Sequence, residues 1–144
     1  MNDNTSSLNK LEQNFRGLII ERCKFCGFDR YLEENPDFEF PKITEDLLEP
    51  NTQCFISIPG MFGGFTYHLE EIGNEPVLYA EQSSRMDHSD DDYLYFEITL
   101  DNSRLLQGEE RKTIAKKFRE LGKKAAEEHA MKLKEIRSNH EPSE

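Results

Sequence analysis

The spacing of apolar residues divides the chain into two helical ends and a strand-like middle. An N-terminal helix is predicted from four apolar positions at steps of three and four residues: Leu8, Leu11, Phe15 and Leu18. Hydroxyl side chains at residues 5–7 can cap its start, and Gly27 can end it. A competing prediction makes residues 17–23 a strand, because Leu-Ile-Ile is rich in branched side chains.

The C-terminal part has the most regular pattern. From Glu109 to about Arg137, six apolar positions keep helical spacing: Ile114, Phe118, Leu121, Ala125, Leu133 and Ile136. Glutamates four residues before lysines add small favourable pairs at Glu120 and Glu128. The sequence therefore predicts a long amphipathic helix.

The middle of the chain alternates between apolar and polar residues. Strands are expected at residues 53–58, 64–71, 77–83 and 92–100, with turns between them. The preceding stretch, 28–52, holds three prolines and is expected to be a connector pinned by Phe38 and Phe40, with a short helix at 44–48.

These elements predict one α+β domain that covers residues 1–144. It consists of an N-terminal helix, a four-stranded antiparallel meander and a long C-terminal helix, with both helices covering the oily face of the meander. We expect an ordered core at about residues 6–137 and disordered tips at 1–5 and 138–144.

Charge changes this picture because it is unevenly placed. The chain has a net charge of −11, but residues 61–103 alone hold ten acids and one base, whereas residues 104–144 hold eight acids and eleven bases. An acidic surface repels phosphate backbones, so nucleic acid is an improbable partner and a basic protein is favoured. The basic stripe Lys112, Lys116, Arg119 and Lys123 is interpreted mainly as a solvated helix face.

Residues 1–9 have no apolar run and no basic start, so no signal peptide is expected. Apolar runs elsewhere are too short for a membrane span. Three cysteines without a secretion signal indicate reduced thiols and a cytoplasmic protein.

Two short motifs are candidates for metal binding. Cys23 and Cys26 form a CxxC pair, for which Cys54 and His68 are weak additional ligands. No second cysteine pair exists, so structural thiols without a metal or cofactor are the favoured interpretation. The acidic loop at 87–92 lacks the residue order of a calcium loop, so it is interpreted as solvated.

A partner-binding surface is predicted on the far side of the sheet. There Tyr79, Tyr93 and Tyr95 alternate away from the expected core, next to Asp90, Asp91 and Asp92. Exposed tyrosines are typical of contact surfaces. The leading hypothesis is therefore a small acidic protein-binding module of the immunity or antitoxin kind, although a loop or the connector would be an equally good cover for these tyrosines.

A resemblance adds an alternative. The stretch Ile58 to Tyr67 (IPGMFGGFTY), then Glu81 to Arg85 (EQSSR), then Glu97 to Thr99 (EIT), resembles a family of small uncharacterised bacterial proteins. The pattern of that family usually has a tryptophan where this chain has Ser83 and a histidine where it has Phe96. The family has no established activity that the resemblance would imply.

The same residues favour a second hypothesis, a small-ligand-binding protein or enzyme with a pocket around Gly63, Gly64, Tyr67, Glu81 and Arg85. Glycines permit close backbone approach, and a lone arginine among acids either ties a loop or binds an anion. No catalytic motif is present, which leaves the enzyme hypothesis the weaker one. A third hypothesis is a homo-oligomer formed through the C-terminal helix.

Overall fold

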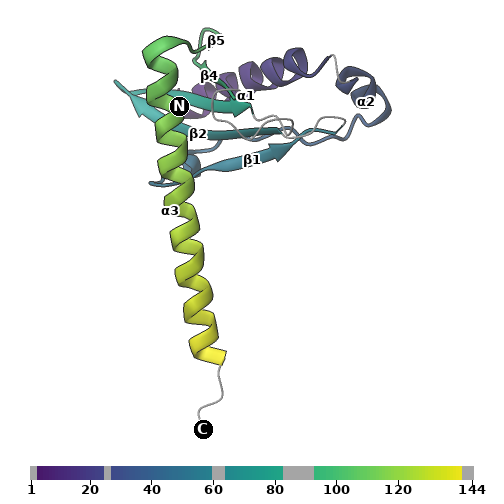
Figure 1. Cartoon of the computed structure of the whole chain (residues 1–144). Coiled ribbons are helices and arrows are strands. Elements are labelled where there is room, and N and C mark those ends of the chain that lie inside the picture. The colour runs from purple at the N-terminus through teal and green to yellow at the C-terminus, as the bar shows by residue number, and fades with distance from the viewer. Residues whose placement is uncertain (1–2, 25–26, 60–63, 83–92, 141–144) are drawn as a thin grey trace.

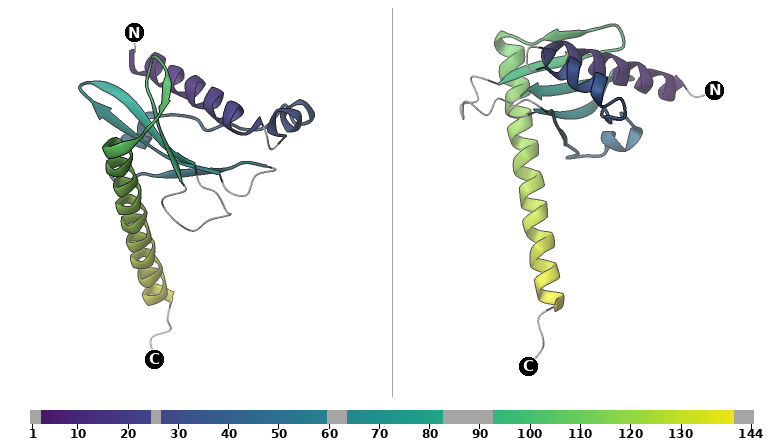
Figure 2. Two further views of the ribbon diagram at one scale, coloured as in Figure 1. Left: turned by 45° about the horizontal axis from the view of Figure 1, so that its top comes forward. Right: turned by 90° about the vertical axis from the view of Figure 1, so that its right-hand side faces the viewer.

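The computed structural model describes residues 3–24, 27–59, 64–82 and 93–140 (Figure 1). A five-stranded antiparallel sheet lies between a helix on one face and a longer helix on the other (Figures 1 and 2). The elements are α1 (Asp3–Arg22), α2 (Phe28–Glu34), the 3₁₀ helix η2 (Glu45–Leu48), β1 (Cys54–Ser57), β2 (Gly64–Ile72), β3 (Glu75–Gln82), β4 (Leu94–Ile98), β5 (Ser103–Leu105) and α3 (Gly108–His140).

The strands form a meander in the order β1-β2-β3-β4-β5, and every neighbouring pair is antiparallel. The α+β class and the helix–sheet–helix order are confirmed, but the sheet has five strands instead of four. The strand expected at 92–100 ends at Ile98, and the chain turns at Thr99–Asn102 into β5. With only three residues, β5 is too short to show an alternating pattern.

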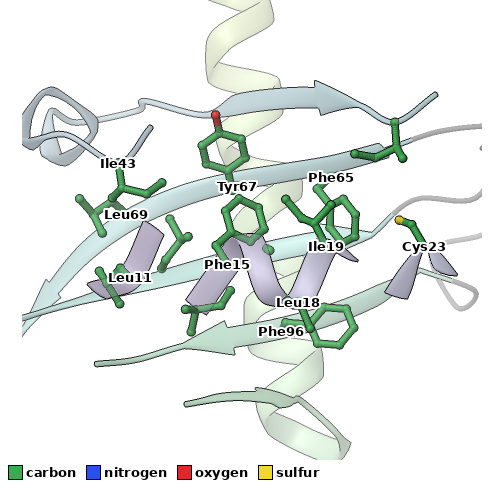
Figure 3. Close-up of a cluster of buried hydrophobic side chains, with 14 of the residues drawn as sticks. Leu11, Phe15, Leu18, Ile19, Cys23, Ile43, Phe65, Tyr67, Leu69 and Phe96 are labelled. Atoms are coloured by element: carbon green, nitrogen blue, oxygen red, sulfur yellow. The ribbon is translucent and has the colours of Figure 1, made fainter. Parts of the chain in front are cut away.

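The face of the sheet beneath α1 holds the main apolar core. Phe15 is fully buried and meets the rings of Phe65 and Tyr67 edge to face, with centroids 6.0 and 5.2 Å away. Figure 3 shows Leu11 and Ile19 beside Phe15 on the same side of α1. The predicted helical face is therefore confirmed, and residues 17–23 are not a strand.

A second, smaller core lies on the opposite face, beneath the first half of α3. It consists of seven buried residues: Val77, Tyr79, Tyr95, Leu106, Ile114, Ala115 and Phe118. The expectation that both helices cover one face is wrong. Tyrosines and valine on β3 and β4 alternate with the leucine, alanine and phenylalanine positions of the main core, so both faces of the central strands bury large side chains.

Helix α3 crosses the strands, leaves the sheet at the β1 edge and continues into solvent (Figures 1 and 2). The crossing ends near Gly122, where a Cβ would lie 3.8 Å from the side-chain nitrogen of Gln53. We call residues 122–140 the α3 arm. At 1.5 Å per residue the arm is about 28 Å long.

The connector differs from the prediction at its start. Residues 28–34 form the short helix α2, which Gly27 precedes in a left-handed conformation with φ of 80°. Phe28, Tyr31, Phe38 and Phe40 pack their rings against one another, so the aromatic pinning is present. The short 3₁₀ helix lies where a helix was expected.

Both terminal helices extend past the core that was expected at residues 6–137. Helix α1 begins at Asp3, and α3 continues to His140. None of the helices in the described ranges is both long and apolar enough to cross a membrane.

Candidate functional site

The sheet face that α3 covers, called here the α3 face, has its titratable and aromatic side chains where α3 crosses the middle of the sheet. Phe118 lies over this crossing, with its ring centroid 4.7 Å from His68 and 5.6 Å from Tyr95. His68 on β2 faces α3 because strand residues alternate between faces, and its neighbour Tyr67 faces α1. His68, which is 3% exposed, therefore packs against the rings of Phe118 and Tyr79.

His68 belongs to a chain of charged and polar groups. Its Nε2 lies 2.8 Å from Oε2 of Glu70, and Nζ of Lys117 lies 2.6 Å from the same oxygen. Glu70 accepts from both, so His68 carries its proton on Nε2 when neutral. Nδ1 of His68 is then buried without a hydrogen-bond partner among the described residues.

Burial and hydrogen bonding together determine the protonation of His68 and Glu70. Burial lowers the pKa of His68, although the hydrogen bond and charge of Glu70 act in the opposite direction. Burial alone would raise the pKa of Glu70, but hydrogen bonds from Lys117 and His68 outweigh it, and that pKa is lowered. At neutral pH the arrangement is a neutral histidine and a glutamate–lysine ion pair.

A shallow concavity lies beside these groups, between β2, the segment before β1 and α3. Its volume is about 400 Å³, and its lining includes Leu48, Thr52, Glu70, Glu71, Lys117 and Leu121. His68 and Glu70 both line this concavity, and the Nδ1 atom of His68 is itself buried. The Glu70–Lys117 ion pair joins α3 to the sheet beside this concavity.

The predicted open tyrosine surface is wrong in its central assumption. Tyr79 and Tyr95 are 6% and 0% exposed, because α3 covers the face that was expected to be free. Tyr95 donates from its hydroxyl to Oε2 of Glu81 at 2.7 Å, and the Arg111 guanidinium lies 5.2 Å from its ring. Tyr93 is half-buried, and Asp90, Asp91 and Asp92 lie outside the described residues.

Tyr79 is also surrounded by charged side chains. Burial, with the nearby charges of Glu97 and Glu70, raises the pKa of Tyr79 to about 12. Glu97 in turn accepts from Arg104 Nε at 2.9 Å, and Arg104 reaches Glu110 at the start of α3 at 2.7 Å. Positive side chains thus neutralise part of the acidic sheet.

Two residues of the alternative pocket, Tyr67 and Glu81, lie on opposite faces of the sheet. Tyr67 faces α1, whereas Glu81 lies in register with Thr66 and faces α3, so the sheet separates them. Gly64 has the predicted close backbone approach, because a Cβ there would collide with the carbonyl oxygen of Ile56. Gly63 and Arg85 lie outside the described residues.

The metal candidates are likewise separated. Cys54 faces Tyr67 on the α1 side, whereas His68 lies on the other side of β2. Burial raises the pKa of the Cys54 thiol, which disfavours the thiolate that a metal needs. Cys23 is buried in the main core, and Cys26 lies outside the described residues. Within the described ranges, no three His, Cys, Asp or Glu side chains gather into a metal-binding group.

The feature that sequence reasoning underrated is the α3 arm. Ile114 and Phe118 pack on the sheet, and helical spacing continues their side of α3 through Leu121 into the arm. We call these continuing positions the arm stripe: Leu121, Ala125 and Leu133. Leu133 is 43% exposed, and Ala125 is exposed as well. The spacing of apolar residues predicted the stripe. It did not predict that the stripe continues past the edge of the sheet.

Comparison with known proteins gives no family for this fold and this arm. No protein-family model matches the chain, and neither does any curated protein or solved structure. The resemblance to small bacterial proteins therefore remains a prediction.

Proposed function

We propose that this protein is a protein-binding module whose docking element is the α3 arm. The observation that carries the proposal is the continuity of the arm stripe with the face of α3 that packs on the sheet. An amphipathic helix is stabilised mainly by packing of its apolar face, and here half of that face has no cover among the described residues. A partner chain would supply the missing cover.

The position of the arm supports this role. Phe118 and the Lys117–Glu70 ion pair fix α3 on the sheet just before the arm begins. The arm is therefore presented in one direction by a folded body, which lowers the ordering cost of binding. Helix-in-groove and helix-on-helix recognition both use such a row of apolar anchors.

The acidic body gives the proposal a narrower form, an immunity- or antitoxin-like role with a basic partner. Eight carboxylates of the connector are exposed and could steer such a partner: Asp29, Glu33, Glu34, Asp37, Glu39, Glu45, Asp46 and Glu49. In this form the acidic contact surface lies on the connector, since Tyr79 and Tyr95 are buried.

The test is affinity capture from cells of the source organism with three baits: wild type, Leu133→Glu and Met131→Glu. Met131 is 66% exposed and lies on the opposite side of the arm, so it receives the same glutamate outside the stripe. We expect wild type and Met131→Glu to recover the same protein and Leu133→Glu to lose it. Equal recovery by all three baits would refute docking through the arm.

A further inference from the structure

We propose that the chain covering the arm stripe is a second copy of this protein, in a two-fold dimer formed across the β1 edge. The inference rests on the proposed function, because it names the partner of the same arm. It is argued from three observations: the course of α3 over the sheet edge, an exposed phenylalanine on that edge, and the opposite charges of α3 and the rest of the chain.

The course of α3 decides where a second copy fits. The helix crosses one face of the sheet and passes over β1, which is an edge strand of four residues (Figures 1 and 2). A two-fold axis perpendicular to the sheet at this edge keeps the α3 faces of both copies on the same side. Each arm then extends over the sheet of the other copy, antiparallel to its α3.

An apolar side chain lies where each arm would arrive. Phe55 on β1 is 57% exposed. It lies in register with Thr66, which is in register with Glu81, and Glu81 with Tyr95, so Phe55 projects from the face that α3 covers. An arm from the second copy would cover Phe55 with its stripe. The same contact covers the stripe, so one interface accounts for both exposed apolar features.

Charge complementarity between α3 and the rest of the chain favours a second copy over a neutral or basic helix. Residues 1–107 hold 21 acids and eight bases, a net charge of −13, whereas α3 holds six acids and ten bases, a net charge of +4. In the two-fold arrangement each basic α3 lies against the acidic body of the other copy, and the attraction occurs twice. The arrangement also closes after two copies, because each arm and each β1 edge is used once.

The experiment is the molar mass of the purified full-length chain across a concentration series, at low and at high ionic strength. The chain has a mass of 16.9 kDa, and we expect a species of two chains that dissociates on dilution. High salt should weaken it, since opposite charges meet at its interface. Leu133→Glu should raise the dissociation constant more than about tenfold, and Phe55→Ala should raise it to a smaller extent.

Met131→Glu is the matched control and should leave the dissociation constant unchanged. Circular dichroism of each variant checks that α3 is still folded, which we expect because Leu133 lies in the arm and is 43% exposed. A two-chain species that resists Leu133→Glu, or one that high salt strengthens, would overturn the inference. So would a species larger than two chains, which the closed arrangement excludes.

A wild-type chain that stays single at the highest concentration also overturns the inference, but it leaves the proposed function open to its own test. If such a single chain still captures another protein through Leu133, the arm is a docking element for a different partner. If it captures nothing that depends on Leu133, both proposals fail.

Discussion

The two faces of the sheet are built from different chemistry. Beneath α1, Phe15, Phe65 and Leu78 are fully buried, and the contacts are mainly apolar and aromatic. Beneath α3, the buried His68 and Tyr95 contact carboxylates, and the interface includes the Glu70–Lys117 ion pair. The first face resembles an ordinary core, and the second combines a small apolar cluster with titratable groups.

This difference indicates which interactions hold each helix on the sheet. Burial of apolar area is the dominant favourable contribution to folding, whereas buried polar groups add little net stability once their desolvation is offset. Helix α1 is therefore expected to carry most of the stability. Helix α3 is held by fewer apolar contacts and by groups with specific geometry, which orients the arm and makes its attachment sensitive to solution conditions.

The largest expected effect comes from removing the central aromatic ring of each face. Phe15→Ala should lower the free energy of unfolding by about 3–5 kcal/mol, because Phe15 is enclosed by the sheet and α1. Phe118→Ala should lower the free energy of unfolding by about 3 kcal/mol, the lower end of this range, because α3 can shift to fill part of the space that the ring leaves. Urea unfolding of both variants measures the two values.

Hydrogen exchange shows in which element each variant loses stability. Phe118→Ala should speed exchange in α3 more than in α1, since its contacts with His68 and Tyr95 are the ones removed. Phe118→Ala could instead lower the free energy of unfolding as much as Phe15→Ala and speed hydrogen exchange throughout the protein. The two faces would then contribute equally to stability, and the contrast between them would be lost.

Much of the fold was predictable because its two terminal helices carry strong periodic patterns. Leu11, Phe15 and Leu18 keep one face of α1, and Ile114, Phe118 and Leu121 keep one face of α3. In the same way, the alternation of apolar and polar residues predicted β2 and β3 close to their observed bounds. These patterns depend only on local spacing, so no knowledge of the tertiary structure was needed.

The arrangement of these elements was harder to predict. Tyr79 and Tyr95 alternate with Leu78 and Phe96, so both sets are compatible with burial, and local spacing does not say which face receives which helix. The tyrosine surface was expected to be open for this reason. The chain of His68, Glu70 and Lys117 depends on two residues of β2 meeting one residue of α3, which no sequence spacing reports.

The second expected effect is a pH dependence that belongs to the α3 face. Because the pKa of His68 is lowered in the folded protein, the unfolded chain binds the proton more readily. Stability is therefore complete above the ordinary histidine pKa of about 6.5 and falls as pH drops below it, by at most about 1.4 kcal/mol per pH unit. Urea unfolding between pH 7 and pH 5 measures the slope.

His68→Gln removes the titrating group and retains a donor for Glu70. This variant should show a flatter slope than wild type over the same range, even if its stability at pH 7 is lower. The carboxylate of Glu70 stays ionised there, since its pKa is lowered. Equal slopes in the two proteins would mean that the burial of His68 does not couple the α3 face to pH.

The smallest expected effect concerns the Lys117–Glu70 ion pair, which lies before the start of the arm. Lys117→Met should lower the free energy of unfolding by at most about 1 kcal/mol, because the Lys117 side chain is 46% exposed and water screens its attraction to Glu70. High salt should reduce the difference further. Lys116→Met at the neighbouring exposed position is the matched control for losing one positive charge. A loss for Lys117→Met as large as that for Phe118→Ala would show that charge, and not apolar packing, holds α3 on the sheet.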